Sequence, residues 1–355
     1  MFLIILFLLN ISFIGCLKAS NAHVPDSVRV DQLAFLDAHN IAMSTKSGWF
    51  YAQQGESVGS LLEKYGVRSM KVPVHWYHKK SFTRSIEEIF GKKEGNTQPY
   101  PALCHEENGG TNCKSSILQR GGKDPESLED FLREIVKFVE KSPKEVILVK
   151  LETYMGSRTS ENYAINMTEK EAVQRFDQAI TDSGLGVYVN KINTWPTLGL
   201  LRNSKKTVIL LGTENAIISD SKYLSPSRLL INQEHWEEAK KADCTLFTST
   251  KESNMTQIGI GHEMSFTKNS PIGLGISALN ASRKLLGFPP LRISNTAIDA
   301  YDFEKVNTRE ALEAELKKCR AKRTITGFVV SGDHVDKGKL REVVDEHNLL
   351  LSVTP

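Results

Sequence analysis

Several features that mark common protein classes are absent from this chain of 355 residues. No C-x-x-C pair occurs among its 5 cysteines, which argues against a structural zinc site. The formal net charge is only +3 and no basic cluster is interleaved with aromatic residues, so no nucleic-acid partner is expected. No internal repeat or low-complexity tract is visible either. With 40% hydrophobic and 25% charged residues, the composition is that of a soluble globular protein.

The first residues are apolar but form too short a run for a membrane span of about 20 residues. Met1 to Gly15 is nearly free of polar residues, although it lacks a Lys or Arg close to Met1. We interpret residues 1–22 as a signal peptide cleaved after Ala22, and residues 23–355 as one domain of a secreted, extracellular protein. An alternative is lipid attachment at Cys16 in Phe13-Ile14-Gly15-Cys16, which would anchor the exported protein to a membrane.

Four cysteines remain after residue 22, an even number in a chain routed to an oxidising compartment. Cys104 and Cys113 are nine residues apart and are predicted to form a disulfide. Cys244 and Cys319 would then be the remaining pair, although the sequence alone does not fix their connection.

Short apolar runs alternate along the chain with amphipathic stretches of helical spacing. The predicted strands are 33–36, 67–74, 101–104, 145–151, 207–211, 244–247, 325–330 and 349–353. The predicted helices are 58–65, 127–141, 170–183, 309–322 and 340–347. Strands joined by helical crossovers in a chain of this length favour an α/β fold, a closed (β/α)8 TIM-type barrel in a single domain. No glycine-rich loop follows the first strand, which counts against an open doubly wound sheet, and residues 224–290 are expected to form loops and insertions.

Two histidines stand at the ends of predicted strands. His39 follows the run Leu33 to Leu36 in Ala38-His39-Asn40, and His105 follows Pro101 to Cys104. A general base and a general acid must approach one substrate from different sides, which two strand ends allow. The pair therefore predicts an acid-base site at the mouth of the barrel.

The order and spacing of several motifs resemble the phosphatidylinositol-specific phospholipase C superfamily, the PLC-like phosphodiesterases, over nearly all of residues 31–348. The motifs are His39-Asn40, Tyr65-Gly66-Val67-Arg68, Leu103-Cys104-His105 with Cys113, Leu128 to Leu132 with Pro143 to Ile147, Thr194 to Leu198, Gly327 to Val330 and Asp333 to Gly338. The resemblance implies that His39 is the catalytic base, His105 the acid, and Asp333 the residue that orients His39. A turn or helix-capping aspartate is the other interpretation of Asp333.

The resemblance leaves open how the charge of a bound phosphate is neutralised. Metal-dependent members use an asparagine after the first histidine and carboxylates on the second and fourth strands as Ca²⁺ ligands. This chain has Asn40 and Glu152, but Lys71 and Pro73 stand where acids would be expected. We therefore predict a site without a cofactor in which Lys71 is the counter-charge, with Ca²⁺ held by Asn40 and Glu152 as the weaker alternative. Lys71 could also simply form a salt bridge with Glu152.

The resemblance implies a phosphoric diester hydrolase that acts by acid-base catalysis on a phospholipid-like substrate, phosphatidylinositol among the candidates. Asn40, Arg68 and Glu152 are expected to bind substrate beside the catalytic His39, His105, Asp333 and Lys71. We expect a monomer that contacts membranes peripherally. Two other functions remain open: a barrel that has lost turnover and acts as a binding or effector protein, and a metal-dependent glycerophosphodiester or sphingomyelin phosphodiesterase.

Overall fold

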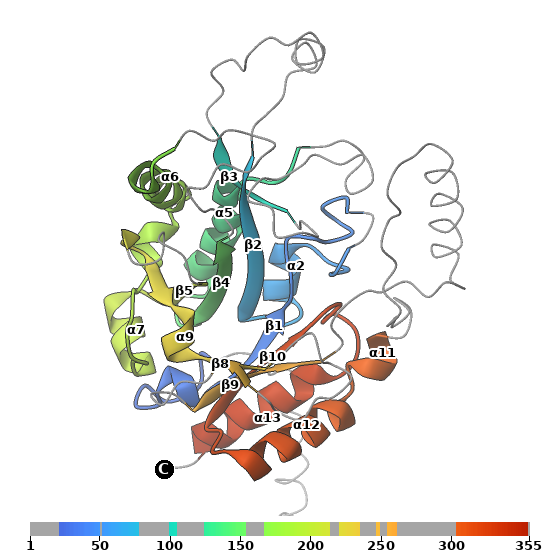
Figure 1. Ribbon diagram of the computed structural model, residues 1–355. Coiled ribbons are helices and arrows are strands. Elements are labelled where there is room, and N and C mark those ends of the chain that lie inside the picture. Colours follow the sequence, from blue (N-terminus) through green and yellow to red (C-terminus); the bar gives the residue numbers. More distant parts are fainter. Residues whose placement is uncertain are drawn as a thin grey trace, which may run out of the picture.

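The computed structural model describes residues 21–49, 52–77, 99–104, 124–153, 167–213, 220–234, 246–248, 254–260 and 303–353. Helices surround a curled, mostly parallel sheet (Figure 1). The strands are β1 (Ala34–Ala38), β2 (Ser69–Tyr77), β3 (Tyr100–Leu103), β4 (Ile147–Thr153), β5 (Val208–Gly212), β6 (Leu224–Pro226), β7 (Asn232–Glu234), β8 (Leu246–Thr248), β9 (Met255–Gly259) and β10 (Gly327–Gly332). The α-helices are α2 (Val58–Glu63), α5 (Leu128–Lys141), α6 (Glu169–Asp182), α7 (Leu198–Ser204), α9 (Ser227–Leu230), α11 (Phe303–Val306), α12 (Arg309–Lys322) and α13 (Leu340–Val353). Two 3-10 helices are η1 (Val30–Gln32) and η2 (Leu185–Tyr188).

The strands follow one another around a barrel. Starting from β1, the neighbours are β2, β4, β5 and β6 in one direction and β10, β9 and β7 in the other, and every one of these pairs is parallel. Both β6 and β7 are described, and no ladder joins them, so the ring has one open junction. The predicted α/β fold of the TIM-barrel type is confirmed.

Some predicted strands lie outside the ring. β3, predicted at 101–104, pairs antiparallel with β2, and β8, predicted at 244–247, pairs antiparallel with β7. In their place β6, β7 and β9 complete the ring from the stretch that was expected to be loops. An apolar run could not reveal these strands, because β6 and β7 have three residues each and β9 places Gln257 in a buried position.

The predicted strand 349–353 is wrong, because these residues are the last turns of α13. The helix buries Leu340, Val343 and Val344 and leaves Leu350 exposed, so its apolar residues follow helical spacing. The side chain of Asn348 donates to the carbonyl of Ala34 (3.0 Å) and accepts from its amide (2.9 Å), which ties α13 to the start of β1. Figure 1 shows α12 and α13 side by side against this part of the sheet.

The other predicted helices are confirmed. Ser127 caps α5 by accepting a hydrogen bond from the amide of Asp130 (3.0 Å), and Ser142 ends the helix before Pro143. The buried face of α5 packs on the outside of the barrel through Phe131, Leu132 and related residues. The start signal, the stop signal and the apolar spacing were sufficient to predict this helix, because each depends only on residues close together in the sequence.

Alternating residues of each strand face two different cores. Phe35, Leu148, Ile209 and Val329 form a cluster inside the ring, whereas their sequence neighbours pack against the helices outside it. Further along the same strands the inward positions become polar, at Asp37, Ser69, Lys150, Gln257 and Ser331, all of them buried. The apolar interior therefore fills one end of the barrel, and polar side chains gather toward the carboxyl ends of the strands.

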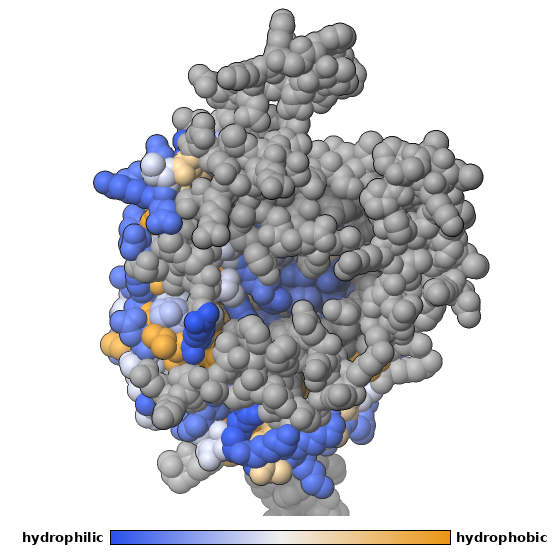
Figure 2. All heavy atoms as spheres, viewed as in Figure 1, coloured by the Kyte–Doolittle hydropathy of each residue, from blue (hydrophilic) through white to orange (hydrophobic). Residues whose placement is uncertain are grey.

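Hydrophobic side chains also reach the surface at one side of the molecule. Leu200 of α7 and Leu229 of α9 are exposed, and Figure 2 shows hydrophobic surface over these two helices. Across the described ranges, no helix combines the length and the apolar character needed to cross a membrane.

A buried ion pair lies outside the barrel, where β2 and β4 begin. Arg68 donates from Nη2 to Oε1 of Glu145 (3.2 Å), and its guanidinium lies 4.5 Å above the ring of Phe138. Glu145 also accepts from the amide of Asn21 (3.0 Å), whose side chain bonds both backbone groups of Val146. A mature chain that begins after the predicted cleavage at Ala22 would lack the contacts of Asn21.

We expect Arg68→Met to lower the free energy of unfolding by about 3–5 kcal/mol, because it leaves Glu145 buried without its cation. Chemical denaturation of the purified protein measures this change. Arg133→Met, which removes a cation from exposed pairs on α5, serves as the control and should cost less than about 1 kcal/mol. Equal losses in the two variants would contradict a structural role for the Arg68 pair.

Candidate active site

His39 and Asp333 meet where the first and last strands of the barrel end. His39 follows β1, Asp333 follows β10, and the amide of His39 donates to the carbonyl of Gly332 (3.0 Å). Nδ1 of His39 lies 2.8 Å from Oδ1 of Asp333. The side chain of His39 is 9% exposed and that of Asp333 0%, so the pair is shielded from bulk water. Asp333 thus contacts the imidazole that it was predicted to orient, and its role in catalysis stays a prediction.

Lys71 lies on the other side of the same imidazole. Its Nζ is 3.4 Å from Nε2 of His39 and 2.9 Å from Oε1 of Glu152 on the neighbouring strand β4. The predicted salt bridge between Lys71 and Glu152 is therefore present. Four side chains, from the ends of β1 and β10 and from β2 and β4, form one row of contacts, Asp333–His39–Lys71–Glu152.

The row selects one tautomer of His39. An ammonium group can only donate, so the nitrogen that faces Lys71 must carry a lone pair. A carboxylate accepts, so the proton of the neutral ring belongs on Nδ1, facing Asp333. The geometry thus favours an imidazole with an unprotonated Nε2 beside a cation, which is the arrangement of a general base next to an anion-binding group.

The polar layer below this row completes its electrostatics. Burial would raise the pKa of Glu152, but the charges of Lys71 and Lys150 outweigh it and hold that pKa below its usual value. Burial lowers the pKa of Lys150 to about 8, with Glu152 opposing the change and Lys71 adding to it. Burial also raises the pKa of Asp37, although the hydroxyls of Ser331 and Ser69 donate to it.

Lys150 and Asp37 belong to the site region but were not predicted. Lys150 donates to Oε1 of Gln257 (3.4 Å), which joins β4 to β9 across the barrel interior. Asp37 joins β2 and β10 through Ser69 Oγ (2.6 Å) and Ser331 Oγ. The sequence did contain a signal for these two residues. Asp37 stands two positions before His39 and Lys150 two positions before Glu152, and residues two apart in a strand lie on the same face.

Arg68 is not brought to this site, so its predicted role in substrate binding is wrong. It stands next to Ser69 at the start of β2, and adjacent residues of a strand point to opposite faces. Ser69 and Lys71 point into the barrel, whereas Arg68 points outward to Glu145 and the carbonyls of Leu62 and Val67. The motif signalled a structural arginine rather than a ligand for substrate.

Asn40 and Glu152, the two residues considered as Ca²⁺ ligands, each have another partner in the structure. The side-chain amide of Asn40 donates to Oε1 of Gln53, and the carboxylate of Glu152 is paired with the ammonium of Lys71. Within the described ranges no group of three or more His, Cys, Asp or Glu side chains is placed to hold a metal ion. Lys71, close to Glu152, would oppose a divalent cation there, so these residues do not fit Ca²⁺.

Other predicted residues fall outside the described part of the chain. His105, Cys113 and Cys244 lie in ranges that the structure does not describe. Cys104, at the end of β3, and Cys319, in α12, are buried. The role of His105 and the Cys104–Cys113 pairing therefore stay predictions.

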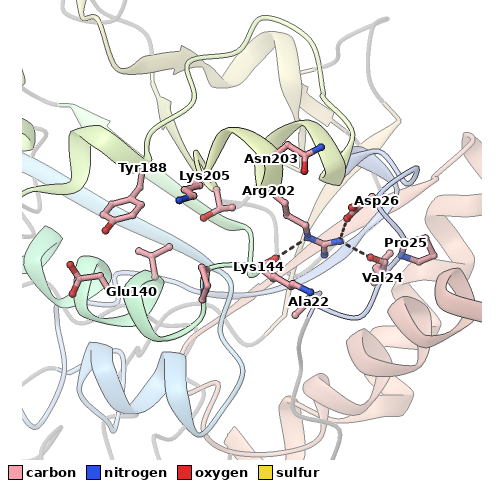
Figure 3. Close-up of a pocket in the computed structure, with 13 residues that line it drawn as sticks. Ala22, Val24, Pro25, Asp26, Glu140, Lys144, Tyr188, Arg202, Asn203 and Lys205 are labelled. Atoms are coloured by element: carbon pink, nitrogen blue, oxygen red, sulfur yellow. Dashed lines mark hydrogen bonds and ion pairs between the residues drawn. The ribbon is translucent and has the colours of Figure 1, made fainter.

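A cavity of about 780 Å³ lies near the starts of β4 and β5, and Figure 3 shows the residues that line it. Arg202 is one of them and donates to the carbonyls of Lys144 (3.1 Å), Val24 (2.8 Å) and Asn21 (2.6 Å) as well as to Asp26. Its guanidinium is thus engaged in holding the N-terminal segment. The cavity shares no residue with the His39 row.

Comparisons with known proteins found similar structures but no similar sequence. A scan against family models and a search of curated proteins found no match to the sequence. The structure is similar to phosphatidylinositol-specific phospholipase C from Listeria monocytogenes (13% identity, 94% of this chain and 97% of that chain, TM-score 0.44). It is similar also to the Staphylococcus aureus enzyme (12%, 92% and 98%, TM-score 0.49) and, more weakly, to a GH113 β-1,4-mannanase (7%, 89% and 99%, TM-score 0.29). The chemistry of this chain must follow from its own residues.

The lowered pKa of Lys150 predicts how stability depends on pH. Between about pH 8 and its usual value of 10.5, the folded protein binds fewer protons at Lys150 than the unfolded chain does, so this residue makes stability rise with pH. We expect the melting temperature of the wild type, relative to Lys150→Met, to be higher at pH 10 than at pH 7. Thermal unfolding at both pH values measures this, and an unchanged difference would contradict a buried, destabilised ammonium.

Proposed function

We propose that the protein is a phosphodiesterase that transfers a phosphoryl group from a lipid-like alcohol to a neighbouring hydroxyl of the same substrate. The observation that carries the proposal is the row Asp333–His39–Lys71, which sets an oriented base beside a partly buried cation at the carboxyl ends of barrel strands. A phosphodiester needs both, because a proton leaves the attacking oxygen while negative charge grows on the non-bridging oxygens. The motif resemblance to PLC-like phosphodiesterases supports the same reaction class.

In the proposed reaction, the hydroxyl next to the phosphate attacks phosphorus and gives its proton to Nε2 of His39. Asp333 stabilises the imidazolium that results, through the Nδ1–H hydrogen bond. The bond from phosphorus to the alkoxide of the leaving alcohol breaks, and that alkoxide takes a proton from the acid, for which His105 is the proposed residue. The products are a cyclic phosphodiester and a free alcohol, diacylglycerol if the substrate is phosphatidylinositol.

Lys71 is proposed to change partners when the substrate binds. At rest its contact with Nε2 of His39 is long, 3.4 Å, while its pair with Glu152 is short, 2.9 Å. An anionic phosphate entering beside His39 attracts the ammonium and leaves Nε2 free to accept a proton. Glu152 holds the ammonium of Lys71 close to the site, where that ammonium is proposed to balance the charge of the phosphate in place of a metal ion.

A second candidate function is binding without turnover. It is favoured by the same Lys71–Glu152 pair, since an ammonium that stays neutralised by Glu152 and bonded to His39 would leave the base blocked. The two functions differ in whether any diester is consumed.

We expect the purified protein to cleave phosphatidylinositol to a cyclic inositol phosphate, with equal rates in the presence and absence of EDTA. Phosphatidylcholine, which has no hydroxyl beside its phosphate, should not be cleaved. His39→Ala and Asp333→Asn are each expected to lower kcat by about 10²–10⁴-fold, because they remove or misorient the base. Phosphorus NMR of the products measures this. Full activity of His39→Ala would exclude the site, and no cleavage of any diester by the wild type would favour the binding function.

Lys71→Met is expected to lower kcat/KM by about 10²–10³-fold, because the charge that stabilises the transition state is removed. Lys71→Arg should recover part of the loss, since it restores the cation. Lys141→Met, at an exposed lysine paired with Glu63 outside the barrel, is the matched control and should retain wild-type kinetics. Wild-type kinetics in Lys71→Met would contradict the proposed counter-charge.

A further inference from the structure

Each member of the His39–Asp333 pair is followed by a residue with a left-handed backbone. Asn40 has φ 49° and His334 has φ 46°, values that residues other than glycine adopt uncommonly. Both strands therefore turn sharply directly after the side chains that form the pair. Such turns persist only where neighbouring groups hold them in place.

One short segment, Ala52 to Gln54, contacts both turns. The carbonyl of Gln53 accepts from the amide of His334 (2.7 Å), and the ring of His334 lies 3.1 Å from the carbonyl of Ala52. The side chain of Gln53 accepts from the amide group of Asn40. Segment 52–54 thus bridges the ends of β1 and β10, which carry His39 and Asp333.

Gln54 makes the central contacts of this bridge. Its side chain is fully buried, and Nε2 donates to the carbonyl of His39 (2.9 Å) and to the carbonyl of Gly332 (3.1 Å). Its Oε1 accepts from the amide of Val335 (3.3 Å). Two donors face two carbonyls and one acceptor faces an N–H, so an amide side chain satisfies every group, whereas Glu would set a carboxylate against both carbonyls.

The segment is also fitted closely on its far side. A Cβ at Gly55 would come within 2.8 Å of Oδ2 of Asp336, so a larger residue directly after Gln54 would require the side chain of Asp336 to move. The amide of Gln54 fixes the backbone of His39 relative to that of Gly332, the residue before Asp333.

We propose that Gln54 is a positioning residue that holds His39 and Asp333 in register, so that Nδ1 meets the carboxylate and Nε2 faces the substrate. This inference rests on the proposed function for its kinetic consequence, but the alignment of the pair is a property of the resting protein. Gln54 touches neither the reacting atoms nor the substrate; it acts through the backbone of the two residues that do.

The test compares Gln54→Met with Asn348→Leu in the full-length protein. Asn348 is the matched control, because its buried amide also bonds backbone groups of β1, but at Ala34, the opposite end of the strand. In Gln54→Met we expect kcat on phosphatidylinositol to fall by about 10–100-fold with KM changed less than about threefold. The midpoint of the acidic limb of the pH profile should move to lower pH, because a misaligned Asp333 stabilises the imidazolium less. Asn348→Leu should lower the melting temperature without either effect.

A second readout does not depend on activity. Nitrogen-15 NMR of histidine-labelled protein, with the His39 signal assigned by its loss in His39→Gln, reports which ring nitrogen carries the proton. We expect the Nδ1–H tautomer to predominate in the wild type and in Asn348→Leu, and to lose population in Gln54→Met. If Gln54→Met does not fold, Gln54→Asn, which keeps the amide but is too short for all three bonds, is expected to show the same change. A wild-type tautomer in the Gln54 variants, or equal changes in Asn348→Leu, would overturn the proposal even if no diester were cleaved.

Discussion

The hydrogen bond between His39 and Asp333 is the interaction on which the candidate site depends. It joins the ends of β1 and β10, strands far apart in sequence that pair only because the barrel curls back on itself. The carboxylate is fully buried and accepts a hydrogen bond from Nδ1–H, which leaves the lone pair of Nε2 facing Lys71. Lys71 is in turn paired with Glu152 of the neighbouring strand β4.

The two ends of the barrel interior differ in composition: one end is apolar and stabilises the fold, and the other is polar and holds the candidate site. Apolar side chains such as Phe35 and Ile209 fill one end and provide most of the stabilisation, while charged groups collect at the other. Burying Lys150 and Asp37 under the site costs stability, which their altered pKa values reflect. Lys150 of the same layer helps Lys71 to lower the pKa of Glu152, so a group whose burial costs stability also favours the charged form of a site residue.

Local patterns predicted the parts of the fold that local energetics decide. Helix α5 followed from its cap at Ser127 and its apolar spacing, and β4 and β5 followed from continuous apolar runs. The same criterion failed for β6, β7 and β9, which are short or carry polar residues inward, and it mistook the end of α13 for a strand. Those elements depend on contacts with other strands and helices, so a short stretch of sequence is not sufficient to predict them.

By itself, the sequence determined the chemical groups and the class of fold: a histidine after the first strand, an aspartate after the last, a lysine where an acid was expected, and the alternation of strands and helices. Only the tertiary structure decided which groups meet. It placed Lys71 beside both His39 and Glu152, turned Arg68 outward to Glu145, and set the side-chain amide of Asn40 against Gln53. The physical reason is that the partners of a strand residue are set by strand register and by the face on which the residue lies, and both depend on how the strands pair across the whole sheet.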